Sequence, residues 1–257
     1  MIHESASVDS TARLAKNVRI GPYTIIGPNV EIDAGTWIGS HCVINGPTII
    51  GRNNQIHPFN SIGGMPQDKK YGGEDTLLTI GNGNVIREYC TFNRGTVQGG
   101  GTTKIGDDNW IMAYVHIAHD CQVGNDIVIA NGTSLAGHVT IEDHVILGGF
   151  TLIHQFCTIG AYSFTGATSA ISKDVLPYIM VAGNYAKPYG INVVGLKRRG
   201  FDEFSLKQLR RAYKSIYMRG NTLEKALLEL EDMKKEGDGV SRIIDFLRRS
   251  SSRGIAR

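Results

Sequence analysis

An aliphatic residue recurs every six residues along most of this chain, and this period constrains the fold more than any other feature. Every sixth position from residue 2 to residue 62 is aliphatic, and the same phase returns over residues 80–92. A phase shifted by one residue then runs over residues 105–171 and is broken only by Thr165. A period of six fits neither a helix nor the simple alternation of an open sheet. It is typical of a parallel β-helix built from short strands and turns.

Three such units close one triangular coil of 18 residues, and coils stack at the usual strand spacing of about 4.8 Å. Residues 18 apart are therefore expected to lie above one another. Glycine makes up 32 of 257 residues, about 12%, against a typical ~7%. The glycines and asparagines that follow the aliphatic positions predict corners with positive φ. A β-sandwich is disfavoured, because its strands do not keep a single period over so long a stretch.

Two interruptions of the period predict excursions from the coil. The steps at Asp68 and Glu74 are not aliphatic, which predicts an insertion over residues 63–79 that leaves the coil and returns in register. A glycine-rich stretch shifts the phase by one residue and predicts a second loop over residues 97–104. Long loops in compact folds are usually functional or disordered.

The period stops near Pro177, and the sequence beyond Gly200 has helical character. We therefore expect a β-helix over residues 1–190 and a small C-terminal helical domain over residues 191–257. Ser205 and Gln208 form a capping box at the start of the first of three amphipathic helices. This domain is basic at Lys197, Arg198, Arg199, Arg210, Arg211, Lys214 and Arg219, which suits docking of an acidic partner.

Composition narrows the class of protein. The formal net charge of +3 is too small for a nucleic-acid-coating surface. No apolar run approaches the ~18 residues of a membrane helix, and the first residues lack the features of a signal peptide. These observations predict a soluble, cytoplasmic protein. The cysteines each follow an aliphatic position by four residues and are expected to fill the core as free thiols; they are Cys42, Cys90, Cys121 and Cys157.

Histidines carry the candidate chemistry. Five of the eight fall within 39 residues; they are His116, His119, His138, His144 and His154. One coil of 18 residues places Gly137 above His119, and His138 above Asp120. An imidazole beside a glycine amide suits a general base next to an oxyanion donor. A histidine-rich metal site, as in carbonic anhydrases built on this fold, stays open as the alternative. The chain has no G-x-S-x-G elbow, P-loop or G-x-G-x-x-G motif.

Several longer motifs make the chain resemble the UDP-N-acetylglucosamine O-acyltransferases that open lipid A synthesis. These motifs are HIAHDC, LAGHV, IHQFCTIGA, FNRGTVQGGG, QDKKYGGE and NVVGLKRRGF, and together they span essentially the whole chain. The resemblance implies a left-handed β-helix, a homotrimer with active sites between subunits, and no cofactor or metal. It also implies transfer of a 3-hydroxyacyl group from acyl carrier protein to the 3-hydroxyl of the UDP-sugar.

The resemblance further implies roles for individual residues. The catalytic histidine of the family falls on His119, with Asp120 orienting its ring and the amide of Gly137 as oxyanion donor. Ala167 falls on the position that limits acyl-chain length, and Val194 departs from an acidic nucleoside contact. The residues implied to bind substrate are Gln67, Asp68, Lys70, His116, His138, His154, Gln155, Asn192, Arg198 and Arg199.

Three other functions compete with this interpretation. A metal-dependent hydratase of the carbonic anhydrase type would use the histidines as ligands. Another UDP-sugar acyltransferase would acylate an amino group, but the N-acyltransferase of lipid A synthesis carries a separate N-terminal uridine-binding domain, for which a repeat beginning at Ile2 leaves no room. A non-catalytic scaffold would not need the intact HIAHDC motif.

Overall fold

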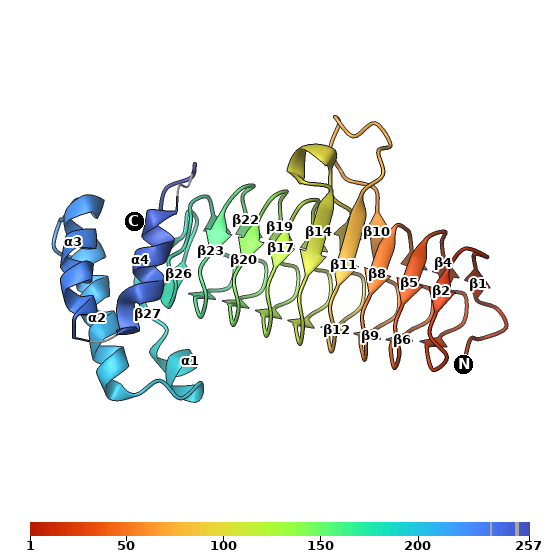
Figure 1. The fold of residues 1–257 in the computed structure, drawn as a ribbon, viewed down its shortest axis with the longest axis horizontal. Coiled ribbons are helices and arrows are strands. Elements are labelled where there is room, and N and C mark those ends of the chain that lie inside the picture. The colour runs from red at the N-terminus through yellow and green to blue at the C-terminus, as the bar shows by residue number, and fades with distance from the viewer. Residues whose placement is uncertain (237, 250–251) are drawn as a thin grey trace.

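Short strands wind into a three-sided, left-handed parallel β-helix that ends in a small helical part (Figure 1). This computed structural model describes residues 1–236, 238–249 and 252–257. Each face is one sheet, and two of the three sheets are wholly parallel. The third sheet ends in an antiparallel pair, β26 (Ile179–Ala182) and β27 (Lys187–Ile191). The faces are called here the tryptophan, histidine and threonine faces, after side chains that each presents outward.

From β1 to β25 the strands of the three faces follow one another in rotation along the chain, and β26 and β27 then both join the tryptophan face. The tryptophan face holds β3 Arg19–Ile20, β6 Trp37–Ile38, β9 Gln55–Ile56, β12 Val85–Ile86, β15 Trp110–Ile111, β18 Val128–Ile129, β21 Ile146–Leu147, β24 Phe164–Thr165, β26 and β27. The histidine face holds β1 Ser7–Val8, β4 Ile25–Ile26, β7 Val43–Ile44, β10 Ser61–Gly64, β13 Thr91–Asn93, β16 His116–Ile117, β19 Ser134–Leu135, β22 Leu152–Ile153 and β25 Ala170–Ile171. The threonine face holds β2 Arg13–Leu14, β5 Val30–Ile32, β8 Thr48–Ile50, β11 Leu77–Ile80, β14 Thr102–Ile105, β17 Gln122–Val123, β20 Thr140–Ile141 and β23 Thr158–Ile159.

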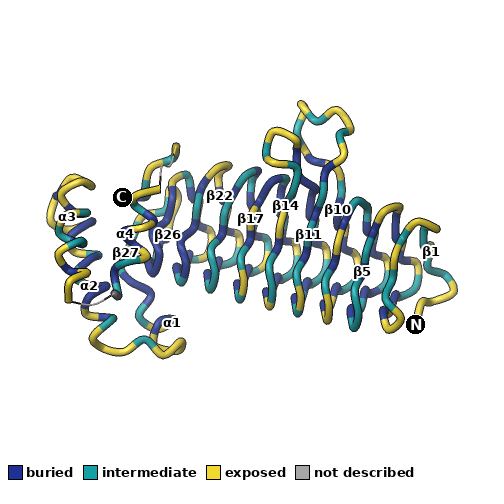
Figure 2. The backbone as a smooth tube through the Cα atoms, viewed as in Figure 1, coloured by how far each residue is buried: buried dark blue, intermediate teal, exposed yellow. Residues whose placement is uncertain are grey.

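From Ile20 onward the aliphatic residues of the repeat are buried, as the period predicts, whereas Ile2 at the N-terminal end is 48% exposed. Figure 2 shows buried positions recurring along the coils. The exception at Thr165 is fully buried, and its hydroxyl accepts a hydrogen bond from the Gly148 amide at 3.0 Å. A threonine replaces an aliphatic residue there because its polar atom is satisfied inside the coil. All four cysteines are buried free thiols, as expected.

The corners are built differently from the prediction. Most corner residues with positive φ are aromatic, histidine or aspartate rather than glycine or asparagine. At the corner between the tryptophan and histidine faces, Tyr23, His41, Phe59, Tyr89 and Tyr114 stack in a ladder with ring centroids 4.9 to 5.3 Å apart. Stacking worth about 0.5–1.5 kcal/mol per pair offsets the strain of about 1–2 kcal/mol for a left-handed residue.

Both predicted excursions leave the coil at the corner between the histidine and threonine faces, called here the His119 corner. Strands β10 and β11 occupy both ends of the predicted insertion, so the excursion itself covers only residues 65–76. The second loop contains the short 3-10 helix η1 (Val97–Gly99) and covers residues 94–101, between β13 and β14, so it begins and ends three residues earlier than predicted. The two excursions project side by side in Figure 1.

The helical part lies within the predicted residues 191–257 but contains one α-helix more than the three expected. Helix α1 (Val193–Arg198) was not expected, and α2 (Glu203–Tyr217) is capped by Asp202 rather than by Ser205. The Asp202 carboxylate accepts a hydrogen bond from the Ser205 amide at 2.8 Å, because an aspartate three residues upstream reaches the free amides of the first turn. The remaining elements are α3 Leu223–Lys234, η2 Asp238–Val240 and α4 Ser241–Arg248.

Candidate active site

The His119 corner holds an imidazole–carboxylate pair. The Nδ1 atom of His119 donates to Oδ2 of Asp120 at 2.8 Å. A carboxylate only accepts hydrogen bonds, so Nδ1 carries the proton and Nε2 keeps its lone pair. Strand alternation alone would separate the two side chains, but Asp120 has φ of 62° and turns back toward its neighbour. The arrangement leaves Nε2 of a side chain that is only 13% exposed as the basic atom.

Asp120 is held in place by the second loop. Its Oδ1 accepts a hydrogen bond from the Thr96 amide at 2.7 Å, and its Oδ2 accepts one from the Thr96 hydroxyl at 2.6 Å. The Asp120 amide donates to Oγ1 of Thr103 at 2.7 Å. A Cβ atom on Gly99 would lie 2.0 Å from Cγ of Asp120. The glycine-rich stretch therefore lets the loop close over the carboxylate, a role that the sequence analysis did not assign.

Gly137 lies against the His119 ring, as the coil spacing predicts. A Cβ atom at this position would lie 2.6 Å from Cε1 and 2.8 Å from Nε2 of His119. The amide of the next residue, His138, donates to the His119 carbonyl at 3.0 Å, which fixes the coils in this register. Within the described residues, the Gly137 amide has no hydrogen-bond acceptor. An unpaired N–H beside a basic nitrogen can stabilise a developing oxyanion.

His138 stacks between the candidate base and the next coil. Its ring meets His119 edge-on at 5.2 Å and lies flat on Phe156 at 4.5 Å. Its Nε2 is 3.7 Å from Oδ2 of Asp120. Burial lowers the pKa of His138, while the charges of Asp120 and of Asp68 in the insertion oppose this shift. The insertion that carries Asp68 leaves the coil at this same corner, between β10 and β11.

His116 stands at the start of a groove on the histidine face. Its Nδ1 is 2.7 Å from Oγ1 of Thr91, one coil below, and burial lowers its pKa. The groove has a volume of about 400 Å³. Its lining is His116, Ser134, Leu135, Ala136, Leu152, Ile153, His154, Ala170, Ile171 and Tyr185. An almost wholly apolar groove that starts beside the candidate base suits a hydrocarbon chain.

Gln155 lies two coils above His119 and is exposed, and its backbone carbonyl accepts a hydrogen bond from Nε of Arg253 at 2.9 Å. Its neighbour His154 is also exposed and lines the groove just described. The structure therefore brings together half of the fourteen predicted site residues: His119, Asp120, Gly137, His138, His116, His154 and Gln155.

In the insertion, Gln67 and Lys70 are exposed, and the Asp68 carboxylate accepts a hydrogen bond from the Lys70 amide at 3.0 Å. Arg94 is buried beneath them, with Nη1 donating to the Gly46 and Gly63 carbonyls at 2.8 Å. Its Nη2 donates to the hydroxyl of Tyr71 at 3.2 Å. Arg94 thus anchors the insertion to the coil, a role that the sequence analysis did not assign although Arg94 lies in the FNRGTVQGGG motif.

The residues implied to bind the nucleotide lie at a different corner, between the threonine and tryptophan faces. Arg199 Nη1 is 2.5 Å from Oδ2 of Asp126 and 2.9 Å from Nδ1 of His144. Arg198 is exposed. Asn192 caps α1: its Oδ1 accepts a hydrogen bond from the Gly195 amide at 3.1 Å, and its Nδ2 donates to the Tyr162 carbonyl at 3.0 Å. One chain does not bring these residues to His119.

Ala167 lies at the third corner, between the tryptophan and histidine faces, and is exposed. It is therefore separated from His119 by the width of the histidine face as well as by 48 residues, or about 2.7 coils. Val194 is 63% exposed on α1. Neither residue contacts the His119 corner within the part of the chain that the structure describes.

The donor atoms of His119, Asp120 and His138 lie within 4.8 Å of one another, as metal ligands would. The Asp120 oxygens, however, already accept three hydrogen bonds, and Nδ1 of His119 supplies one of them. The Asp120 carboxylate is therefore occupied in orienting the His119 imidazole and in holding the loop at Thr96. This arrangement favours a general base over a metal centre.

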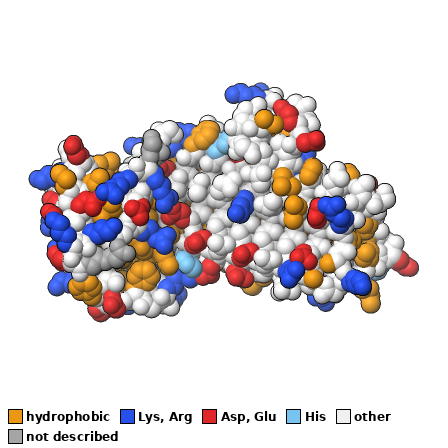
Figure 3. All heavy atoms as spheres, in the orientation of Figure 1, with side chains coloured by type: hydrophobic (Ala, Val, Ile, Leu, Met, Phe, Trp, Pro, Cys, Tyr) orange, Lys and Arg blue, Asp and Glu red, His pale blue; other side chains and the backbone are white. Residues whose placement is uncertain are grey.

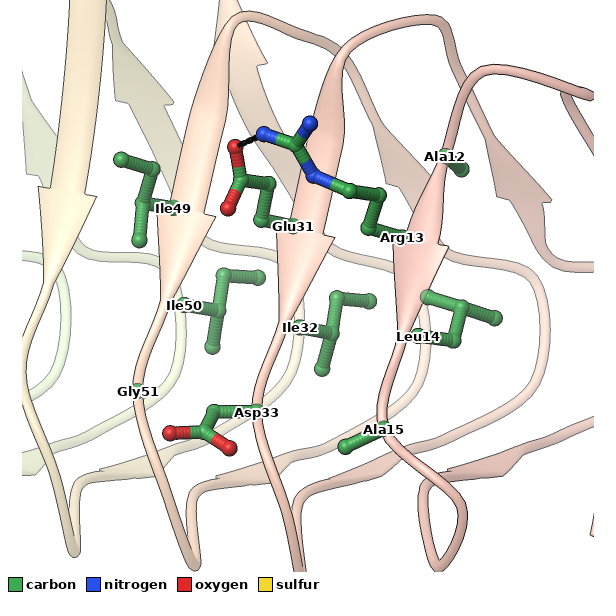
Figure 4. A pocket seen from close by; sticks show the side chains of 10 residues that line it. All are labelled: Ala12, Arg13, Leu14, Ala15, Glu31, Ile32, Asp33, Ile49, Ile50 and Gly51. Carbon is green, nitrogen blue, oxygen red and sulfur yellow. Dashed lines mark hydrogen bonds and ion pairs between the residues drawn. The ribbon is translucent and has the colours of Figure 1, made fainter.

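A second hollow of about 620 Å³ lies on the threonine face near the N-terminus (Figure 4). Its lining includes the exposed ion pair between Arg13 and Glu31 and the side chains of Ile49 and Ile50. None of the clustered histidines lines it. This hollow therefore holds none of the groups that make the His119 corner a candidate active site.

Fold and site together define an acyltransferase of the hexapeptide-repeat class. Residues 102–137 match the family model described as bacterial transferase hexapeptide, with six repeats. Residues 174–256 match the model described as UDP N-acetylglucosamine O-acyltransferase, domain 2.

The chain belongs to the UDP-N-acetylglucosamine O-acyltransferase family. It is 52% identical over 248 residues to the acyl-[acyl-carrier-protein]–UDP-N-acetylglucosamine O-acyltransferase of Xanthomonas campestris, covering 96% of this chain and 94% of that relative. The solved structure of LpxA from Acinetobacter baumannii superposes with a TM-score of 0.97 at 48% identity, over 100% of this chain and 99% of the other. The acyltransferase of Francisella novicida gives a TM-score of 0.97 at 40% identity, over 100% and 94%. Among the described residues, no helix has the length and apolar character to cross a membrane.

Proposed function

We propose that this protein transfers a 3-hydroxyacyl group from acyl carrier protein to the 3-hydroxyl of UDP-N-acetylglucosamine, the first step of lipid A biosynthesis. One observation carries the proposal: the His119–Asp120 pair stands beside the unpaired Gly137 amide in a member of this family. The four buried free thiols support a reducing, cytoplasmic location.

The geometry suggests the order of events. Nε2 of His119 takes the proton of the sugar hydroxyl as its oxygen attacks the thioester carbonyl. The carbonyl oxygen becomes an oxyanion, and the Gly137 amide donates a hydrogen bond to it. When the intermediate collapses, the carbon–sulfur bond breaks, and the imidazolium returns its proton to the departing thiolate. Asp120 holds the ring in the productive tautomer and stabilises its positive charge.

The surrounding residues supply binding. The insertion residues Gln67, Asp68 and Lys70, together with His138 and Gln155, are proposed to hold the sugar over the His119 corner. His116 and His154 border the groove that takes the acyl chain. Asn192, Arg198 and Arg199 are proposed for the nucleotide, since guanidinium groups suit a diphosphate.

A homotrimer is also proposed. In one chain the threonine face separates the His119 corner from the corner at which Arg199 lies. A cleft that contains both sets of residues therefore needs a neighbouring subunit. The outward column of the tryptophan face is apolar at Trp37, Val85, Trp110, Val128, Ile146, Phe164 and Met180. Threefold symmetry would bury this column in three equivalent contacts. Sedimentation equilibrium is expected to give a trimer, and a fully active monomer would refute it.

Ala167 is proposed to limit acyl-chain length. In such a trimer, a chain running along the groove on the histidine face approaches the corner that holds Ala167. Removing its methyl in Ala167→Gly is expected to move the preferred donor toward longer chains, by about 10–200-fold in relative kcat/KM. An unchanged optimum across a ladder of acyl donors would assign the limit to another side chain, such as Phe164 or Tyr162.

Transfer assays on the parent protein test the reaction itself. Acyl carrier proteins of several chain lengths are paired with UDP-N-acetylglucosamine and with its 3-amino analogue. Ester formation with the hydroxyl sugar is the expected result. Exclusive amide formation would instead identify an N-acyltransferase, and the absence of transfer to either sugar would overturn the proposal.

A further inference from the structure

The cations expected to dock an acidic partner are mostly neutralised within the chain. Arg211 pairs with Glu236 at 2.5 Å, and Arg219 pairs with Glu229 at 2.9 Å. The other predicted basic positions with acidic partners are Lys197 and Arg210 with Glu203, and Arg199 with Asp126. Lys and Arg side chains gather visibly at the helical end (Figure 3), but their charge there is largely balanced by neighbouring carboxylates.

A different group of basic side chains lies at the upper end of the His119 corner. Lys173, Lys187 and Arg257 line a cavity of about 180 Å³. Within the described residues, neither lysine has a carboxylate partner, and both are exposed. Arg257 Nη2 donates to the carbonyls of Ile216 and Asn221, at 3.1 and 3.3 Å. These three residues are called here the Lys173 rim, and its two lysines form a cationic surface that no side-chain carboxylate of the described residues neutralises.

The rim is aligned with the catalytic corner. Lys173 follows β25 by two residues, just as His119 follows β16 and Gln155 follows β22. Lys173 therefore stands three coils above His119 on the same edge, a distance of roughly 14 Å along the axis at about 4.8 Å per coil. The rim cavity also shares Ile171 and Tyr185 with the apolar groove that begins at His116.

We infer that the Lys173 rim is the docking surface for the acyl carrier protein, with the phosphate of its prosthetic arm at these cations. The inference rests on the proposed function. Carrier proteins of this kind are acidic and hold the acyl thioester at the end of a long phosphopantetheine arm. A phosphate at the rim leaves an extended arm to run along the corner to His119. Complementary charge of this kind speeds encounter and fixes orientation.

The test is a double charge reversal, Lys173→Glu with Lys187→Glu. The KM for the acylated carrier protein is expected to rise about tenfold or more, with kcat within twofold of the parent. The rate with the same acyl group on N-acetylcysteamine, which has neither carrier nor phosphate, is expected to stay within twofold. Binding of fluorescently labelled acyl carrier protein, followed by anisotropy, is expected to weaken by the same factor.

The matched control reverses two exposed lysines elsewhere, Lys16→Glu with Lys225→Glu, and makes the same change in net charge. An equal rise in KM for this control would reduce the effect to overall charge and overturn the inference. An unchanged carrier KM in the Lys173 and Lys187 variant would overturn it while leaving the transferase function intact. Carrier binding that depends on the two lysines, without transfer to the sugar, would instead support docking and defeat the proposed function.

Discussion

Two regions of the β-helix stack polar side chains one coil above another, with opposite outcomes. Inside the lower coils, Asn54, Asn84 and Asn109 form a ladder in which each Oδ1 accepts from the amide of the next coil at 2.9 Å. Their Nδ2 atoms donate to backbone carbonyls, as that of Asn109 does to Gly124 at 3.0 Å. At the His119 corner, the same stacking leaves Nε2 of His119 and the Gly137 amide available.

The difference shows how one repeat serves two purposes. A buried ladder must satisfy every polar atom, because an unpaired buried group costs about 1–3 kcal/mol. A reactive corner needs the opposite, since an atom already bonded cannot take a proton or bind an oxyanion. The four predictions below separate the two regions by whether activity or stability changes.

Substitution of His119 by alanine should have the largest effect. Loss of the general base is expected to lower kcat by about 10²–10⁴-fold while the unfolding temperature changes little. Steady-state transfer with carrier-bound donor measures this. The matched control is His41→Asn in the aromatic ladder at another corner, which should keep near-parental kcat. A folded His119 variant with activity within a few-fold of the parent would remove His119 from the mechanism.

Gly137→Ala should have the next largest effect on activity. The new methyl would lie 2.6 Å from the His119 ring and must displace it. A displacement of about 1 Å can cost about 10²-fold in rate. Gly149→Ala is the control, because its nearest neighbour lies 3.4 Å away. Equal kinetics for the two alanine variants would show that close contact at Gly137 is not required for catalysis.

Asn84→Ala should have the opposite effect to the two substitutions above, because it should lower stability and leave activity unchanged. It removes the partners of the Asn109 amide and the Gly106 carbonyl inside the prism, which is expected to cost about 2–5 kcal/mol in urea unfolding. The kcat of the folded variant should match the parent. Asn82→Ala removes similar bonds on the exposed surface and should cost less than ~1 kcal/mol, because water replaces the lost partners. Comparable losses for the two variants would contradict a special role for the buried ladder.

The smallest effect expected is on the pH dependence of stability. Burial lowers the pKa of His116 and of His138 in the folded protein. The unfolded chain, with histidine pKa near 6.5, therefore takes up protons first. Stability should be fully present above about pH 6.5 and fall as the pH drops through the lowered folded-state pKa. His116→Gln should reduce the loss of unfolding free energy between pH 7 and pH 5, measured by urea titration. A larger loss in this variant would show that burial does not lower the pKa of His116.

Much of the fold and part of the site were predictable because an 18-residue coil converts sequence separation into distance. That conversion placed Gly137 on His119 and His138 over Asp120, and the structure has both contacts. Corner composition was wrong, because the stacking of rings between coils outweighs the local preference of glycine for positive φ. The Ser205 cap was also wrong, since Asp202 competes for the same free amides.

The sequence by itself determined the prism, its buried column and the vertical neighbours of each corner residue, because all three depend on a fixed period. Three contacts could be found only in the tertiary structure. Thr96 donates a hydrogen bond to Asp120, and Arg94 anchors the insertion through Tyr71. Arg199 pairs with Asp126, 73 residues away in the chain. The tertiary structure also pairs most of the basic side chains of the helical part with carboxylates, as for Arg211 and Arg219. These contacts join loops and helices to the coil. The loops and helices do not follow the six-residue period, so distance along the chain does not predict distance in space, and the path of the backbone determines which side chains meet.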